Sequence, residues 1–275
     1  MLAVGCGNAP DSTAPLEALG EGVARVDVVW WDLNGVRRSR AFGTAFRVGS
    51  RGELLTAHHV AANARTQSEN LGAGTRARIL VVFAPAEPEP GSDEGAAPSL
   101  EVEIAAEDPE ADLALLRGVG TPLEGGEEGS ARLASARPSA ESPIAVVGYP
   151  IGEPHLVVRT GRLLDPAILL DAPLEATGPQ RTRLEEQLRD GAVLVADVET
   201  RLGNSGAPIY LAESREIIGL CSAVLIRGSI ARRELFPLPD PPGATLTLII
   251  AAQRIQSFLD AHRAPGRLSE PATSP

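Results

Sequence analysis

The sequence has 275 residues, of which 43% are apolar and 22% charged, and its mean hydropathy is zero. This composition excludes wholesale disorder, and a chain of this length can bury a full hydrophobic core. The apolar run from Leu246 to Ala252, which is interrupted by Thr247, is far too short to span a bilayer. The charge is 25 basic minus 36 acidic residues, or −11. It disfavours nucleic acid and anionic lipid, which are bound mainly through phosphates.

The first residues allow two interpretations, and we expect residues 1–21 to be a flexible segment under either. Met1 to Cys6 resembles the end of a bacterial lipoprotein signal, in which a small residue precedes a lipidated cysteine. That interpretation requires a true start further upstream. It favours an extracytoplasmic protein that is secreted, periplasmic or lipid-anchored at Cys6. The alternative is a frayed terminus with an unrelated cysteine. Cys6 and Cys221 stand in unrelated contexts, so we expect no disulfide between them.

The first half of the chain predicts short strands separated by turns. Asn34-Gly35 is a strong hairpin signal after the first strand. Ala84 to Ser99 is acidic and rich in Pro, Gly and Ala, which is typical of a solvated surface loop. The expected strands are Val26–Leu33, Ala41–Val48, Glu53–Thr56, Ala77–Phe83, Leu100–Ala106 and Leu113–Leu116.

The second half repeats the strand pattern and adds two helices. Gln180–Arg189 predicts a surface helix, because Leu184 and Leu188 lie four residues apart among charged residues. Ala251–His262 predicts a closing helix with one apolar face. The expected strands are Ile144–Val147, Leu156–Leu164, Val193–Val198, Ile217–Leu225 and Thr245–Ile250. Two runs of strands indicate barrels or sandwiches rather than an α/β sheet.

Three segments contain residues suited to nucleophilic catalysis. They are Leu54–Val60 with two adjacent histidines, Glu107–Leu116 with an aspartate, and Gly203–Pro208 with a serine between glycines. A serine hydroxyl is a poor nucleophile until an imidazole accepts its proton. The imidazole in turn needs a carboxylate to fix its tautomer and stabilise its cation. Each segment alone is modest support for catalysis, whereas the three together supply all of these groups.

In the order His, Asp, Ser, these segments resemble the chymotrypsin-fold serine peptidases, especially the bacterial branch that includes the HtrA proteases. The resemblance extends to Gly43–Val48, Val147–Pro150, Arg159–Gly161 and Ile218–Ser222. It implies an all-β fold of two antiparallel six-stranded barrels with a C-terminal helix. We expect the first barrel over residues 22–118, a linker over 119–139 and the second barrel with its helix over 140–263. Residues 264–275 are expected to be a disordered tail.

The resemblance assigns a role to each candidate catalytic residue. Ser205 is the nucleophile, His59 is the general base and then the acid, and Asp112 orients His59. The backbone N–H groups of Gly203 and Ser205 form the oxyanion hole. Ser222 aligns with a serine whose hydroxyl supports the aspartate. A protein or peptide substrate is implied, and no cofactor.

The resemblance also places the floor of the substrate pocket six positions before the nucleophile, at Glu199. Ser222, Ala223 and Val224 are the expected pocket residues beside it. A carboxylate at the base of a partly dry pocket would favour Arg or Lys before the cut, because a cationic side chain offsets its buried charge. Alternatively, Glu199 turns to solvent or pairs with Arg201 and leaves a small apolar pocket, which matches the preference of the HtrA-like branch.

Two other kinds of site do not fit the sequence. An α/β-hydrolase elbow reads Gly-x-Ser-x-Gly in the order Ser, acid, His, but Ala207 occupies the last position and only His262 follows. A zinc site is disfavoured because His58 and His59 are adjacent and diverge at a strand end, with no Glu at metalloprotease spacing. The same alternation predicts that only one of the two histidines, His59, faces Ser205.

The sequence therefore predicts a serine endopeptidase. The alternative is a protein-binding or regulatory module with the same fold and little turnover. Asn204 stands where the zymogen-activated relatives have an Asp, so we expect no activation through that salt bridge. The HtrA proteases carry a PDZ domain after the catalytic domain, and we expect none in this chain. The oligomeric state stays open.

Overall fold

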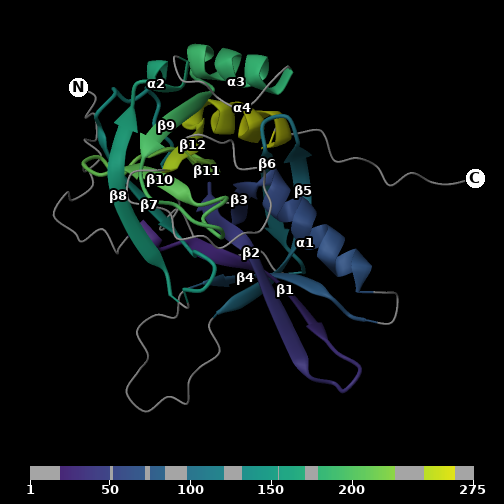
Figure 1. Ribbon diagram of the computed structural model, residues 1–275. Helices are drawn as coiled ribbons and strands as arrows, with labels where there is room; N and C mark the ends of the chain where they lie inside the picture. The colour runs from purple at the N-terminus through teal and green to yellow at the C-terminus, as the bar shows by residue number, and fades with distance from the viewer. Residues whose placement is uncertain are drawn as a thin grey trace, which may run out of the picture.

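The two runs of strands form two closed antiparallel barrels of six strands each, as expected (Figure 1). The computed structural model describes residues 19–49, 52–71, 75–83, 98–120, 132–153, 155–170, 179–226 and 245–263. The first barrel contains β1 (Val23–Trp31), β2 (Arg37–Val48), β3 (Glu53–Ala57), β4 (Arg78–Phe83), β5 (Ser99–Asp108) and β6 (Leu113–Gly118). Its strands follow the order β1-β2-β3-β6-β5-β4 around the barrel.

The second barrel has the same number of strands and closes in the same way. Its strands are β7 (Pro143–Gly148), β8 (Val157–Leu164), β9 (Val193–Asp197), β10 (Pro208–Leu211), β11 (Ile217–Ile226) and β12 (Thr245–Ala251). They follow the order β10-β11-β12-β9-β8-β7. The strand β10 was not expected from the sequence, because it is only four residues long and begins with a proline.

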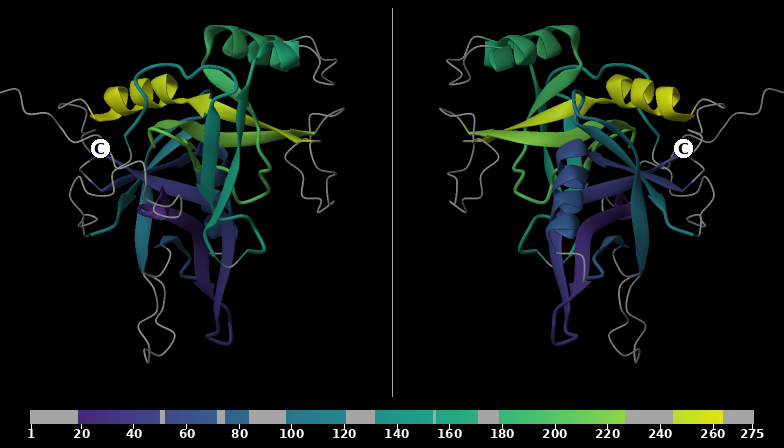
Figure 2. Two further views of the ribbon diagram at one scale, coloured as in Figure 1. Left: turned by 90° about the vertical axis from the view of Figure 1, so that its left-hand side faces the viewer. Right: turned by 90° about the vertical axis from the view of Figure 1, so that its right-hand side faces the viewer.

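Two helices pack on the second barrel at the end away from the β1–β2 hairpin (Figure 2). In α3 (Pro179–Asp190), Leu188 is buried against Val195 of β9 and Leu169 of the short helix α2 (Ala167–Leu170). In α4 (Ala252–Arg263), the buried face contains Ile255, Phe258 and Leu259, as the apolar spacing predicts. None of the helices in the described part of the chain has the length and apolar character needed to cross a membrane.

The helix α1 (His58–Asn70) corrects the prediction that the two histidines end a strand. The helix begins after Ala57, whose side chain makes no capping hydrogen bond. Its buried residues are only Val60, Ala61 and Ala64, so the apolar face is small. The usual start signal and the usual hydrophobic stripe are both weak, which explains why the sequence pattern does not reveal this helix.

The described ends of the N-terminal segment and of the linker both contact the second barrel. Leu19 is buried, and the Tyr210 hydroxyl donates a 3.1 Å hydrogen bond to its carbonyl oxygen. The prediction of a flexible segment up to residue 21 therefore needs correction at its end. Leu133 forms a parallel bridge with Ile217 of β11, within the range expected to be a linker. The acidic loop expected at 84–99 lies almost wholly outside the described residues, as does the expected tail from 264.

Cys221 is a free, buried thiol in β11, which agrees with the expectation for this residue. Its burial raises the pKa of the thiol to about 12, so it stays protonated and packs as a small apolar side chain. Cys6, with the lipoprotein-like segment, lies outside the described residues.

Candidate active site

His59 and Asp112 meet at the N-terminus of α1. The two carboxylate oxygens of Asp112 lie 3.0 and 2.9 Å from His59 Nδ1. The backbone N–H of His59 also donates to Asp112 Oδ1 at 3.0 Å, and that of His58 donates to the Asp112 carbonyl oxygen at 3.0 Å. The first N–H groups of a helix have no partner within the helix. The Asp112 carboxylate therefore does two things: it accepts a backbone N–H at the start of α1, and it holds the His59 imidazole in place.

The turn between β5 and β6 presents Asp112 in a left-handed backbone conformation with φ of 57°. Asp and Asn tolerate this region better than other residues that have a Cβ atom. The preceding turn is fixed by Asp108 Oδ1, which accepts the Ala111 N–H at 2.9 Å. The local sequence therefore fixes the direction in which the Asp112 carboxylate leaves the turn.

Ser222 supplies a further donor to the same carboxylate, because its hydroxyl lies 2.6 Å from Asp112 Oδ2. Burial alone would raise the pKa of the Asp112 carboxyl. The hydrogen bond and attraction from His59, together with the Ser222 hydroxyl, outweigh this and lower the pKa below its ordinary value. Asp112 is thus ionised near neutral pH and can only accept hydrogen bonds. His59 Nδ1 must then carry the proton, which leaves Nε2 as the acceptor.

The backbone of Ser205 contacts β2 of the first barrel. Its carbonyl oxygen accepts the Thr44 N–H at 2.9 Å. A Cβ atom on Gly43 would lie 2.7 Å from the Ser205 carbonyl and 2.6 Å from Val60, the residue after His59. In the second barrel, the Gly206 N–H donates to Cys221, next to Ser222. Among the described residues, no hydrogen bond joins the Ser205 hydroxyl to the His59 ring. Catalytic bonds of this kind often tighten only when substrate binds.

The loop before Ser205 orients two N–H groups that donate to no group in the described chain, those of Gly203 and Ser205. In a planar trans peptide the N–H points opposite to the preceding carbonyl. The Leu202 carbonyl accepts the Ile151 N–H at 2.6 Å, and the Asn204 carbonyl accepts the Ala207 N–H at 2.9 Å. These two bonds therefore fix the directions of the Gly203 and Ser205 N–H groups.

Glycine is required at position 203 for two reasons. Its φ is 97°, a conformation that L side chains rarely adopt. A Cβ atom there would also collide with the Tyr149 carbonyl and lie 2.6 Å from the Ile151 nitrogen. The close approach of the Tyr149–Ile151 segment is what brings the Ile151 N–H to the Leu202 carbonyl.

Thr44 connects the first barrel to this loop, a role that sequence reasoning missed. Its hydroxyl donates to the Gly203 carbonyl at 2.7 Å and accepts the Tyr149 N–H at 3.0 Å. Together with its bond to Ser205, it touches three points of the second barrel, and its side chain is fully buried. The motif Gly43–Val48 was singled out as a strand, but nothing in it shows which groups the threonine hydroxyl would meet.

We expect Thr44→Val to lower kcat roughly tenfold or more, because the loop that orients the Gly203 N–H loses its anchor. The variant also removes two buried hydrogen bonds, to the Gly203 carbonyl and from the Tyr149 N–H, at a cost of about 1–3 kcal/mol in stability. Thr44→Ser retains the hydroxyl and should keep most activity. Steady-state kinetics on a peptide substrate, with kcat and KM separated, checks this.

Thr247→Val is the matched control for Thr44→Val. Thr247 is also fully buried, and its hydroxyl bonds Thr200 at 2.7 Å and the Val198 carbonyl at 2.9 Å. It should cost comparable stability and keep kcat. An equal loss of kcat in both variants would show that Thr44 matters only for general stability.

The adjacent His58 belongs to a separate cluster on the surface of the first barrel. Its Nδ1 lies 3.2 Å from Glu107 Oε1, and Arg65 NH1 lies 2.6 Å from Glu107 Oε2. The hydrogen bond to Glu107 raises the pKa of the Arg65 guanidinium, which therefore stays positively charged. The structure thus gives each histidine its own carboxylate, Glu107 for His58 and Asp112 for His59.

Glu199 corrects the interpretation in which a carboxylate lies at the base of a dry pocket. Its side chain is 56% exposed and accepts two hydrogen bonds from Arg201, at 2.9 and 2.6 Å. Residues alternate along this segment, so the neighbouring Val198 and Thr200 are buried while Glu199 points outward. The geometry favours the alternative in which Glu199 pairs with Arg201. Ser222 and Ala223 are half-buried, and the Val224 side chain lies outside the described part.

We expect Glu199→Ala to leave the preference for the residue before the cut unchanged, because an exposed ion pair contributes little and offers no buried charge to offset. Matched peptides with Arg, Val or Ala at that position, assayed on the wild type and the variant, measure this. If the wild type prefers Arg before the cut and Glu199→Ala loses this preference, the interpretation in which Glu199 lies at the floor of the pocket would be correct.

The two closed six-stranded barrels define a chymotrypsin-like fold. The sequence matches the trypsin-like peptidase domain over residues 43–220. The chain therefore belongs to the trypsin-like peptidase family, a family of hydrolases that act on proteins or peptides. The matched range includes His59, Asp112 and Ser205. No individual curated protein matches the sequence.

Proposed function

We propose that the chain is a serine endopeptidase that uses His59, Asp112 and Ser205 as its catalytic triad. The observation that carries the proposal is the arrangement around the Asp112 carboxylate. It accepts hydrogen bonds from the His59 ring and the Ser222 hydroxyl, while Thr44 of β2 and Cys221 of β11 hold the backbone of Ser205 and Gly206. The segments that contain His59, Asp112 and Ser222, which are remote in sequence, thus meet at one carboxylate.

In the proposed reaction, His59 Nε2 accepts the Ser205 proton as Oγ attacks the scissile carbonyl carbon. The negative charge that develops on the carbonyl oxygen is stabilised by the Gly203 and Ser205 N–H groups. His59 then donates the proton to the leaving amine, and the C–N bond breaks to give an acyl-enzyme. Water, deprotonated by His59, attacks the acyl carbon; the ester C–Oγ bond then breaks, the carboxylic acid leaves, and His59 returns the proton to Ser205 Oγ.

The electrostatics of the site support this sequence of steps. Asp112 has a lowered pKa, so it remains a carboxylate while His59 becomes positively charged. Its side chain is only 13% exposed and that of His59 only 15%, so solvent screens their attraction weakly. The motif around Ser205 also resembles the HtrA-like branch, and we include that branch in the proposal.

Labelling with a fluorophosphonate probe tests the proposal on the intact chain. The Ser205 oxygen should displace fluoride from phosphorus, and mass spectrometry should locate the adduct on Ser205. A cleavage assay on a peptide library should then show internal cuts. A chain that binds peptides but is neither labelled nor cleaves any of them would instead be the protein-binding module.

A further inference from the structure

The β1–β2 hairpin extends well beyond the first barrel (Figures 1 and 2). β2 pairs with β3 only over Phe46–Val48, whereas it pairs with β1 from Arg37 to Phe46. In the described chain no strand pairs with the other edge of β2 from Arg37 to Gly43. An unpaired strand edge offers N–H and C=O groups to which an extended peptide can add as a further strand.

This free edge leads directly to the proposed nucleophile. It ends at Gly43, beside the Ser205 carbonyl, and at Thr44, which bonds that carbonyl. A strand rises about 3.3 Å per residue. Arg40 therefore lies about 10 Å from Gly43 along the strand, and Arg37 about 20 Å. A substrate extended along β2 would reach these arginines with its third to sixth residues from the scissile bond.

The edge lies on the side of the site from which the leaving group departs. His59 must protonate the leaving amine, so the C-terminal part of the substrate leaves the site near this residue. Val60, the next residue, is in close contact with Gly43 of β2. Further along the strand, Arg40 donates to Gln67 of α1 at 3.1 Å. The acyl part of the substrate instead faces the N–H groups of the second barrel.

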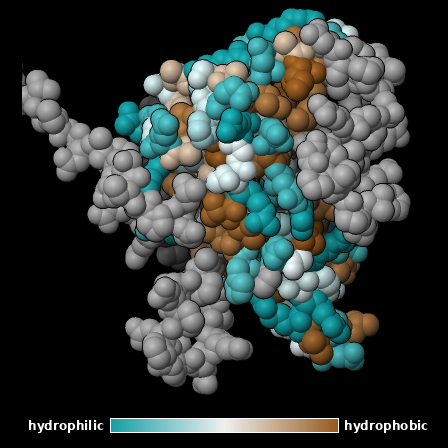
Figure 3. Space-filling view, turned by 60° about the vertical axis from the view of Figure 1, so that its left-hand side comes forward, coloured by the Kyte–Doolittle hydropathy of each residue, from teal (hydrophilic) through white to brown (hydrophobic). Residues whose placement is uncertain are grey.

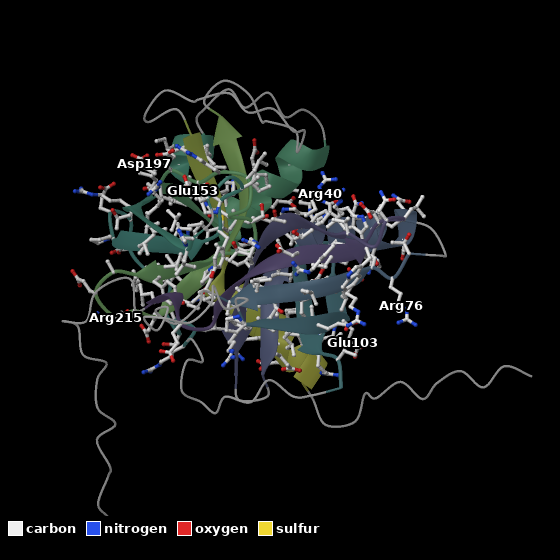
Figure 4. The ribbon with its side chains drawn as sticks, turned by 90° about the horizontal axis from the view of Figure 1, so that it is seen from below. Arg40, Arg76, Glu103, Glu153, Asp197 and Arg215 are labelled. Atoms are coloured by element: carbon white, nitrogen blue, oxygen red, sulfur yellow. The ribbon has the colours of Figure 1, made fainter. Side chains whose placement is uncertain are left out.

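The free edge is positively charged although the chain is strongly acidic. Between Asp32 and Ala41, the only charged residues are Asp32, Arg37, Arg38 and Arg40, and the three arginines are exposed. Arg38 pairs with Asp32 at 2.9 Å, whereas Arg37 and Arg40 pair with no carboxylate of the described chain. Figure 4 shows Arg40 and the acidic Glu103 on different sides of the first barrel. No carboxylate of the described chain neutralises these two guanidinium groups, although Arg40 donates to Gln67 and lies over the Phe42 ring.

Apolar side chains accompany these charges at the tip of the hairpin. Trp31 is 42% exposed, Val36 46%, and Leu33 is fully exposed. Figure 3 shows apolar and hydrophilic atoms intermixed on this projecting tip. Exposed apolar side chains gathered on one element are typical of an interaction surface.

We propose that the edge of β2 binds the substrate on the C-terminal side of the scissile bond and selects acidic residues three to six positions after it. This inference rests on the proposed function, since it deepens that function by naming the class of substrate. Main-chain pairing with β2 supplies affinity, and Arg37, Arg38 and Arg40 supply the preference for carboxylates. A neutral or basic segment at these positions would leave Arg37 and Arg40 without a carboxylate partner.

Three peptides that share one cleavable core test the proposal, with Glu, Gln or Arg at positions three to six after the cut. We measure kcat/KM on the wild type and dissociation constants on the inactive Ser205→Ala chain, so that binding is read even without turnover. The Glu peptide should be favoured roughly tenfold over the Gln peptide at low salt. This advantage should shrink as NaCl is raised, because exposed charges are screened.

The triple variant Arg37→Ser, Arg38→Ser, Arg40→Ser should lose the preference while still cleaving the Gln peptide. Its matched control replaces three exposed arginines of the second half of the chain, which carry the same charge. These are Arg132, Arg162 and Arg189. The control should keep the preference for the Glu peptide. Fluorophosphonate labelling of Ser205 in both triple variants shows whether the catalytic site is intact.

Equal handling of the Glu and Gln peptides by the wild type, in both kcat/KM and binding, would overturn the proposal. So would an equal loss in the control variant, which would assign the effect to overall charge.

Binding of duplex DNA or anionic vesicles through Arg37, Arg38 and Arg40, without any acidic preference, would assign the edge to another partner. If these arginines only prevent edge-to-edge aggregation, the triple variant aggregates and its peptide preference is unchanged. If the chain is neither labelled nor active but still binds the Glu peptide more tightly than the Gln peptide, the proposed function is wrong and the acidic preference of the β2 edge stands.

Discussion

Replacing Ser205 by alanine is expected to lower kcat by roughly 10⁴–10⁶, because the acyl-enzyme can no longer form. The contacts that position this residue are made by its backbone, whose carbonyl accepts the Thr44 N–H at 2.9 Å. Alanine retains that bond, and the lost hydroxyl makes no hydrogen bond within the described chain. The free energy of unfolding should therefore change by no more than about 0.5 kcal/mol.

The measurement combines steady-state kinetics on a peptide substrate with denaturant unfolding of both proteins. Ser257→Ala is a suitable control, since Ser257 lies on the exposed face of α4 and its hydroxyl bonds only the Gln253 carbonyl at 3.0 Å. That variant should keep wild-type turnover. Wild-type turnover in Ser205→Ala would end the serine peptidase proposal, whatever the result for labelling.

The strands were predictable because their signals are local. Turn residues such as Asn34-Gly35 and alternating apolar positions locate most strand ends to within a few residues. The helix α1 was not predictable in this way, since its buried side is built from Val60 and two alanines and its first residue has no cap. Its N-terminus is instead completed by Asp112, which is more than fifty residues away in sequence. No pattern within the helix reveals that partner.

The candidate site shows the same division between local and distant information. The resemblance places His59, Asp112, Ser205 and Ser222 in the chain, and the structure gives the distances among three of them. The resemblance could not show that Thr44 holds the Gly203 carbonyl, because that contact joins residues of different barrels. For Glu199 the local pattern was available but was not used. Counting back from the nucleophile ignored the alternation of buried and exposed residues that turns this side chain to solvent.

Replacing His59 by alanine is expected to lower kcat by roughly 10⁴–10⁶, whereas His58→Ala should lower it by less than about tenfold. The sequence argument for this difference relied on alternation at a strand end, and the structure supplies a different reason. Both residues lie in the first turn of α1, where successive side chains point about 100° apart. His59 therefore contacts Asp112, while His58 contacts Glu107. Only His59 shares its carboxylate with Ser222.

The kinetics of both variants on one peptide, together with their thermal unfolding, separate catalysis from stability. His59→Ala leaves the buried Asp112 carboxylate without its imidazole, so some loss of stability, about 1–3 kcal/mol, accompanies the loss of turnover. His58→Ala removes one ion-pair partner of Glu107, which keeps Arg65 at 2.6 Å, and should unfold almost like the wild type. If His58→Ala abolished turnover and His59→Ala retained it, the register of the catalytic histidine would be wrong by one residue. The Asp112 carboxylate would then serve to complete the N-terminus of α1 rather than to orient a base.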